Sequence, residues 1–310
     1  MLEIFDDIAL LKEKSANISV KIDGDTSAMA GTKNAALRAV GAVAASVDLV
    51  YGKDTGKTGR AANPNLAAFC LVRPPGHHAG PDSSGGFCFF NNAGIAARYA
   101  QERYGVGKVA VLDFDIHHGN GTEDGFKSSE ALFYGSTHQR EGYPGTGYDP
   151  TPHVGDKAKD PLHRRIVDRY TNIGKKNKAP DFRSKWTEVL DEMVLFAPNF
   201  VIISAGFDAH KNDPLSDANL VEEDFHWATT EIYRACHRID PTNSIPIISV
   251  LEGGYNIYNL GQSVLAHVKV LEKGYNCLSS ATASTTKVWC PRSGQNQSQR
   301  SPGCGILGRL

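Results

Sequence analysis

Short runs of apolar residues alternate along the chain with longer segments in which apolar residues recur at helical spacing. The short runs are rich in β-branched and aromatic residues and too short for good helices, so they predict buried strands. The predicted strands cover residues 66–72, 108–114, 131–135, 200–204 and 245–251. The predicted helices cover residues 27–51, 93–104, 122–126, 184–196, 220–238 and 258–274. Apolar strands that alternate with helices predict an α/β fold, in which a single-domain parallel sheet carries helices on both faces.

Two parts of the chain depart from this alternation. Residues 139–183 are rich in Pro, Gly and Lys and predict a long irregular region, which inside a domain is usually functional or mobile. Residues 277–310 shift to Ser, Thr, Gln, Gly and Arg, a composition too polar to order itself. We therefore expect one domain over residues 1–276, followed by a disordered tail over residues 277–310.

The amino-acid composition of the chain excludes several classes of protein. The 310 residues are 41% apolar, enough for a sizeable core, and 33 Lys and Arg balance 34 Asp and Glu. This balance argues against direct nucleic-acid binding by bulk charge. No apolar run approaches membrane-spanning length, and the start of the chain lacks the basic residues of a secretory signal. The six Cys form no CxxC pair, so we expect free thiols in a reducing compartment, the cytoplasm or nucleus.

Polar side chains follow the predicted strands at the points where these strands end. They are His77 and His78, Asp115 and His117, Ser136 and His138, Asp208, and Tyr255. The loops after parallel strands meet at the carboxyl edge of the sheet, where open α/β folds place their binding sites. Five such clusters on one edge predict a functional site there.

Three of these residues predict a metal site. Alternate side chains of an extended segment share a face, so Asp113, Asp115 and His117 project the same way at the end of one strand. Asp115 and His117 with Asp208 would give three protein ligands and an open position, as at a catalytic Zn2+. The alternatives are ordinary: an Asp-x-Asp at a strand end is often a helix cap or a solvated turn, and Asp208 could cap a helix.

The residues around this cluster suggest acid–base chemistry. His77 and His78 follow a Pro-Pro-Gly turn and would form a general base and acid pair, with Asp113 and Asn120 as their orienting partners. Tyr255 follows two glycines and could donate a hydrogen bond to a developing oxyanion. The alternatives are that one histidine lies in the core and the other at the surface, and that Tyr255 is an ordinary loop residue.

Aromatic residues in two loops suggest an apolar channel beside the cluster. Its walls would come from residues 85–90, including Gly86 and Phe87, and from Tyr143 in a Tyr-Pro-Gly segment. For Phe89 and Phe90 a place in the core is the better interpretation. The other histidines have no comparable context and are interpreted as structural or surface residues: His138, His153, His163, His210, His226, His237 and His267.

With these residues assembled, the chain resembles the class II zinc-dependent histone deacetylases, which have the arginase/deacetylase fold. The resemblance runs from about Gly24 to His267. Its motifs are Arg73-Pro-Pro-Gly-His-His-Ala79, Gly86-Phe-Cys-Phe-Phe-Asn-Asn92, Asp113-Phe-Asp-Ile-His-His-Gly-Asn-Gly-Thr122, Tyr143-Pro-Gly-Thr-Gly147, Ser204-Ala-Gly-Phe-Asp-Ala-His210 and Leu251-Glu-Gly-Gly-Tyr-Asn256. Several long motifs in the order of the family make the resemblance specific.

The resemblance implies a role for each site residue. Zinc would bind Asp115, His117 and Asp208, and His77 and His78 would transfer protons. Tyr255 would polarise the acetyl carbonyl, and Gly86 and Phe87 would line the acetyl-lysine tunnel. A monovalent cation, K+, would lie beside the zinc, near Asp113 and Ser136. Asn120 is the class II form, and Tyr255 is typical of the active branch.

The implied activity is removal of acetyl groups from acetyl-lysine of histones or other proteins. Two alternatives stay open: hydrolysis of acetylpolyamines by the same machinery, and a catalytically silent scaffold that binds acetyl-lysine. The chain begins near a point where family members already have a strand and a rim loop. We therefore expect this N-terminal part of the family domain to be missing.

Overall fold

Seven parallel strands form the central sheet of the structure, a computed structural model that describes residues 19–52, 67–148, 166–171, 179–278 and 287–289. The strands are β3 (Ala67–Cys70), β4 (Val109–Asp113), β5 (Leu132–Gln139), β6 (Ile166–Thr171), β7 (Phe200–Ala205), β8 (Ile247–Leu251) and β9 (Lys287–Trp289). Their order across the sheet is β6-β5-β4-β7-β8-β3-β9. All residues of β3, β4, β7 and β8 are buried, as expected for strands covered on both faces.

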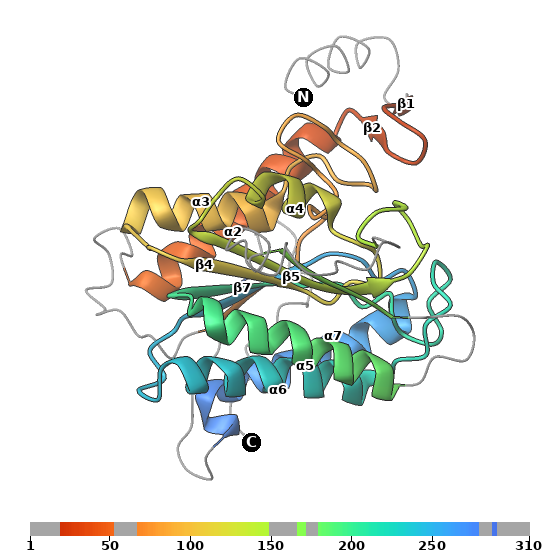
Figure 1. The fold of residues 1–310 in the computed structure, drawn as a ribbon. Coiled ribbons are helices and arrows are strands. Elements are labelled where there is room, and N and C mark those ends of the chain that lie inside the picture. The colour runs from red at the N-terminus through yellow and green to blue at the C-terminus, as the bar shows by residue number, and fades with distance from the viewer. Residues whose placement is uncertain (1–18, 53–66, 149–165, 172–178, 279–286, 290–310) are drawn as a thin grey trace, which may run out of the picture.

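Helices cover both faces of the sheet, as the sequence predicts (Figure 1). One layer holds α2 (Thr32–Tyr51), α3 (Asn92–Tyr104) and α4 (Asn120–Phe126). The other holds α5 (Ala179–Phe196), α6 (Glu222–Ile239) and α7 (Ile257–Lys273), and a 3-10 turn, η2 (Gly274–Cys277), follows α7. None of the described helices combines the length and the apolar character needed to cross a membrane.

The two layers pack on the sheet through different side chains. The α2 and α3 side is rich in alanines, which let these helices lie close to the sheet. The α5, α6 and α7 side contains a cluster of aromatic rings that includes Phe114, Trp186, Phe207 and Phe225. Aromatic side chains bury the largest apolar areas, so this layer contributes strongly to the hydrophobic stabilisation of the fold.

A small hairpin precedes the first long helix and corrects one sequence prediction. Residues 27–51 are predicted as one helix, but Ser27–Met29 form β2, which pairs antiparallel with β1 (Ser19–Lys21). The helix α2 begins only at Thr32, after Gly31. A helical apolar pattern and a short strand cannot be told apart over three residues, and the pairing partner that decides lies outside the pattern.

Besides β1 and β2, two strands of the central sheet, β6 and β9, lie where the sequence predicts none. β6 lies within the predicted irregular region 139–183, and its adjacent charged residues Asp168 and Arg169 interrupt the apolar signal of a strand. β9 lies within the tail predicted to be disordered, so that expectation is wrong for Lys287–Trp289. Backbone hydrogen bonds to the edge of β3 form this strand, and such pairing needs no apolar run. The rest of the tail beyond Leu278 lies outside the described residues.

Candidate active site

Two aspartates and a histidine meet where β4 and β7 end. Asp115 and Asp208 are fully buried, and His117 is 13% exposed. The Nδ1 atom of His117 lies 3.1 Å from Oδ1 of Asp115 and 2.9 Å from Oδ2 of Asp208. One donor atom from each residue lies within 4.8 Å of the other two. The sequence separates Asp208 from this pair by some 90 residues, and the neighbouring strands β4 and β7 bring it there.

Glycines make room for the two carboxylates. A Cβ on Gly206 would lie 2.0 Å from Oδ2 of Asp115, and one on Gly253 would lie 2.2 Å from Oδ2 of Asp208. The backbone N–H of Gly253 also donates a hydrogen bond to Oδ2 of Asp115 at 2.8 Å. These close approaches exclude any side chain at either glycine, so both belong to the site although neither carries a reactive group.

The donor set fits a divalent metal. Two carboxylates and an imidazole are ligands that Zn2+ accepts. Nε2 of His77 lies 3.9 Å from Oδ2 of Asp115, beside this donor set. Burial and, after it, the charge of the neighbouring Asp115 carboxylate together raise the pKa of Asp208 to about 6. Two carboxylates in contact without solvent repel each other, and a bound cation would offset this cost.

His77 and His78 lie beside this cluster and have opposite charge preferences. Nδ1 of His77 lies 3.1 Å from Oδ2 of Asp113, and Nδ1 of His78 lies 2.8 Å from Oδ1 of Asn120. Burial alone would lower the pKa of His77, but the carboxylates of Asp115 and Asp113 raise it to about 10. Burial and the neighbouring His77 lower the pKa of His78 well below its usual value. Such a separation of two neighbouring pKa values is typical of acid–base pairs.

Glu252 holds the histidine turn in place and was not identified from the sequence. Its Oε2 accepts hydrogen bonds from the backbone N–H groups of Gly76 at 2.7 Å and His77 at 3.1 Å. Its Oε1 accepts one from Ser204 Oγ at 3.1 Å, so the carboxyl joins the loop after β3 to the strand β7. Burial raises the pKa of Glu252 to about 7. Its place directly after the β8 strand is the signal that could have found it.

Tyr255 is positioned by the end of β8 and the start of α7. Its backbone N–H donates a hydrogen bond to Oδ2 of Asp213 at 2.7 Å. Asp213, like Glu252, was not identified from the sequence. The next residue, Asn256, caps α7 by accepting a hydrogen bond from the N–H of Asn259. The Tyr255 ring meets the Phe87 ring edge-on, with 5.8 Å between centroids. Burial raises the pKa of Tyr255, so its hydroxyl stays protonated.

The predicted channel residues also lie beside the histidine pair. The rings of Tyr143 and His78 meet edge-on at 4.9 Å between centroids. Gly86 has a φ of +54°, and a Cβ there would lie 2.1 Å from the His78 ring. The hairpin contributes as well, because the N–H of Gly86 donates to Oδ1 of Asp25 and the N–H of Phe87 donates to Oγ1 of Thr26.

Ser136 lies opposite Asp113 in the parallel register of β5 and β4, as the predicted K+ site requires. Its hydroxyl contacts Nδ1 of His138 at 2.9 Å.

His138 itself, interpreted from the sequence as structural or surface, is fully buried. His210 and His267 are also buried, in line with a structural place, and His153 and His163 lie outside the described residues.

Comparisons with known proteins identify a family and several relatives. Residues 5–271 match the sequence model of the histone deacetylase domain. A type-2 histone deacetylase 2 of Dictyostelium discoideum is 38% identical over 253 residues, which cover 76% of this chain but 14% of that protein. The chain therefore spans a small part of the length of this curated relative.

Two solved structures have a similar fold. One is the crystal structure of the HDA15 HD domain, with a TM-score of 0.70 and 33% identity, covering 86% of this chain and 70% of that one. The other is an acetylpolyamine aminohydrolase from Burkholderia pseudomallei, with a TM-score of 0.70 and 26% identity, covering 89% of this chain and 80% of that one. The chain thus has the arginase/deacetylase fold predicted from its sequence.

Proposed function

Because the chain belongs to the histone deacetylase family, we propose that it is a Zn2+-dependent hydrolase that removes the acetyl group from acetyl-lysine in histones or other proteins. The observation that carries this proposal is the meeting of a buried Asp-His-Asp donor set with a histidine pair. Each group is needed for hydrolysis of an amide, and they come from three separate loops, after β3, β4 and β7.

Asp115, His117 and Asp208 would hold the zinc ion. When bound, zinc would supply Lewis-acid polarisation of the acetyl carbonyl and acidify water. The carboxylate oxygens of Asp113 and Asp208 accept hydrogen bonds from the backbone N–H groups of Asp115 and Ile116. These bonds fix the β4–α4 loop, so the donor atoms are held in place before any ligand arrives.

His78 would accept the proton of the attacking water. Its lowered pKa keeps the imidazole neutral, and the contact with Asn120 fixes the ring. His77, which Asp113 and Asp115 favour in the charged form, would keep positive charge next to the reacting groups. The pair then returns a proton to the leaving ε-amine, so that acetate and a free lysine are formed.

Tyr255 would donate its phenolic hydrogen bond to the oxyanion that develops on the acetyl carbonyl. A donor fixed before the reaction and shielded from water stabilises such charge strongly. The rings of Phe87 and Tyr143, which contact Tyr255 and His78, would form an apolar wall for the aliphatic lysine chain. For K+, the register of Ser136 and Asp113 supports a site beside the zinc.

A substrate assay on the full chain loaded with zinc tests this proposal. We expect turnover of a fluorogenic acetyl-lysine peptide and a loss of about 100-fold or more in Tyr255→Phe, with zinc content unchanged. The matched control is Tyr258→Phe, because Tyr258 is 74% exposed on the same segment. Equal turnover in Tyr255→Phe and the control would refute the role of Tyr255.

Acetylpolyamines form a second candidate substrate class, favoured by the similarity to the Burkholderia acetylpolyamine aminohydrolase. Both classes present an acetylated primary amine on an aliphatic chain, so the same residues would act on either. Parallel measurement of kcat/KM for an acetyl-lysine peptide and for acetylputrescine distinguishes them. Tight hydroxamate binding without hydrolysis of either substrate would instead indicate a silent scaffold.

A further inference from the structure

The backbone that leads into Tyr255 does not by itself fix the direction of this side chain. Two glycines precede it, and Gly254 has a φ of +127°, a conformation that other residues rarely adopt. A Cβ at Gly254 would lie 2.8 Å from Cδ1 of Leu260. Because glycine has more accessible backbone conformations than any other residue, the Tyr255 hydroxyl needs support from elsewhere in the chain.

The carboxylate of Asp213, in the loop after β7, provides this support. Asp213 is only 7% exposed, so its oxygens need partners within the protein. Its Oδ2 accepts hydrogen bonds from the backbone N–H groups of Tyr255 at 2.7 Å and Asn256 at 3.3 Å. Its Oδ1 accepts one from the N–H of Leu215 at 3.0 Å. The negative charge also lies at the N-terminus of α7, where the helix dipole favours it.

Three asparagines join the same two segments at a second point. Nδ2 of Asn256 donates a hydrogen bond to the backbone oxygen of Asn212 at 3.1 Å. Nδ2 of Asn212 donates to Oδ1 of Asn259 at 3.4 Å, within the first turn of α7. A displacement of the segment that carries Tyr255 would therefore break several hydrogen bonds at once.

The loop that contains Asp213 is closed on itself and also carries Asp208. Leu220 exchanges backbone hydrogen bonds with Ala209 at 3.1 Å and with Lys211 at 2.9 Å, which ties the end of the loop to its start. Asp208, one of the proposed zinc ligands, directly precedes this closure. Asp213 thus connects the loop of a metal-binding residue to the backbone of the proposed oxyanion donor.

We propose that Asp213 is a positioning residue, which holds the Tyr255 hydroxyl at a fixed place relative to the metal-binding residues. This inference rests on the proposed function, because it concerns the same reaction. Asp213 would act through the backbone of Tyr255 and not on the substrate. A hydrogen-bond donor stabilises an oxyanion only at the right distance, and a misplacement of about 1 Å can cost ~100-fold in rate.

Steady-state kinetics of the zinc-loaded full chain test this role. Asp213→Ala should lower kcat by about 10-fold or more and leave KM within about 2-fold, because the oxyanion contact is made in the transition state. In the Tyr255→Phe background the same substitution should cost less than about 2-fold, since its effect passes through the phenol. Asp213→Asn keeps one acceptor oxygen and should give an intermediate kcat.

The matched control is Asp217→Ala, which changes an exposed aspartate of the same loop and should keep the wild-type kcat. Zinc content and a cooperative melt must be unchanged in every variant that is compared. An unchanged kcat in Asp213→Ala, or an equal loss in both backgrounds, would overturn the proposal.

Hydrogen exchange of the same chain supplies a readout that does not depend on activity. Asp213→Ala should speed exchange of the Tyr255 and Asn256 amides by about 10-fold or more, because both N–H groups lose their acceptor. Tyr255→Phe should leave these rates unchanged, because it keeps the backbone bonds. Unchanged rates in Asp213→Ala would refute the positioning role even in an active deacetylase. Faster exchange in a chain without turnover would support it and refute the proposed function alone.

Discussion

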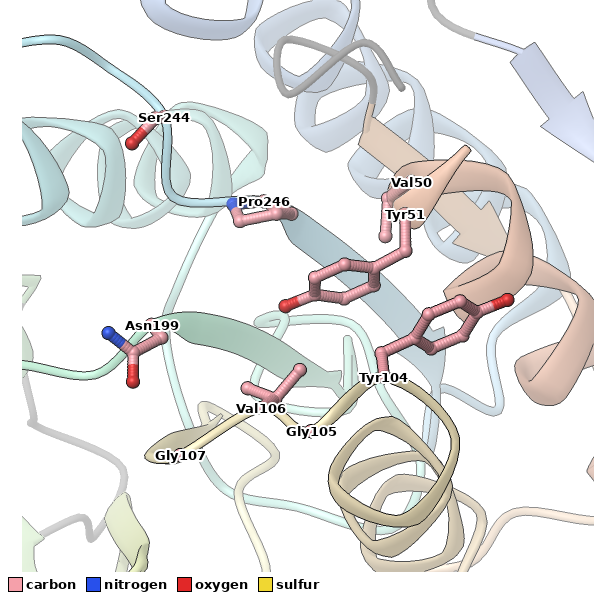
Figure 2. A pocket seen from close by; sticks show the side chains of 9 residues that line it. All are labelled: Val50, Tyr51, Tyr104, Gly105, Val106, Gly107, Asn199, Ser244 and Pro246. Atoms are coloured by element: carbon pink, nitrogen blue, oxygen red, sulfur yellow. The ribbon is translucent and has the colours of Figure 1, made fainter. Parts of the chain in front are cut away.

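The two edges of the central sheet differ in what they bury. At the carboxyl edge, the segments after β4 and β7 bring Asp115, His117 and Asp208 into contact, and Tyr255 follows β8. At the amino edge, before the same strands begin, a cavity of about 400 Å³ opens instead (Figure 2). It is lined by Val50, Tyr51, Tyr104, Gly105, Val106, Gly107, Asn199, Ser244 and Pro246. No side chain in this lining is a carboxylate or a histidine.

The comparison shows that the cavity and the cluster of reactive side chains lie at different edges of the sheet. The amino-edge cavity is walled by the stacked rings of Tyr51 and Tyr104, whose centroids lie 5.0 Å apart. The carboxyl edge concentrates buried titratable groups. Burying such groups costs free energy of folding, and clusters of them are typical of functional sites. Substitutions at the two edges should accordingly have different effects on activity and stability.

The largest difference is expected for catalysis. His78→Ala removes the proposed proton acceptor and should lower kcat/KM by about 100-fold or more. Tyr51→Phe at the amino edge should leave kcat/KM at the wild-type value. Zinc content and a cooperative melt must be unchanged in both variants for the comparison to hold. Comparable activity in His78→Ala would remove the distinction between the two edges.

A smaller effect is expected for the pH dependence of the rate. In Asn120→Asp, a carboxylate replaces the amide beside His78 and should raise the pKa of that histidine by about 1 unit or more. A base must be deprotonated to act, so the acid limb of the kcat/KM profile should move to higher pH. The rate is then lost first at low pH and retained at high pH. A stationary limb would argue against His78 as the base.

The buried core between the edges should set an acid limit to stability. Burial lowers the pKa of His267 to about 3, and the ring contacts Thr229 at 2.7 Å and Ser249 at 2.8 Å. Unfolded His267 binds a proton below about pH 6.5 while the native form does not, so stability falls as pH falls from there toward 3. The slope is about 1.4 kcal/mol per pH unit.

Denaturant unfolding at pH 7, 6 and 5 measures this slope. His267→Asn should have a lower stability at pH 7 and a shallower acid slope than the wild type. His237→Asn, at an exposed position of α6, should keep the wild-type slope. Identical slopes in all three proteins would mean that other groups cause the acid loss.

The smallest effect is expected at the amino-edge cavity. The hydroxyl of Tyr51 is buried and makes no hydrogen bond to a described residue, so Tyr51→Phe should be neutral or stabilising by up to about 1 kcal/mol. Tyr104→Phe is the matched variant, because that hydroxyl donates to Oδ1 of Asp48 and its loss should cost about 1 kcal/mol. Equal urea midpoints for both variants would contradict this distinction.

The sequence by itself determined the fold class and the order of the site residues. Apolar strand runs such as Val109–Asp113 record burial on both faces, and this signal is local. The contacts of His77 with Asp113 and of His78 with Asn120 were also predicted, and both are present in the structure. Their catalytic roles stay predictions.

Only the tertiary structure decided which distant residues meet. The edge strand β6 pairs with β5 through backbone atoms, and it places Asp168 near His118, which no local pattern indicates. Glu252, Gly206 and Gly253 likewise became part of the site through close approaches across strands. Periodicity reports which side of an element is buried. It carries no information on which element lies against it, because strand order and register depend on the packing of the whole chain.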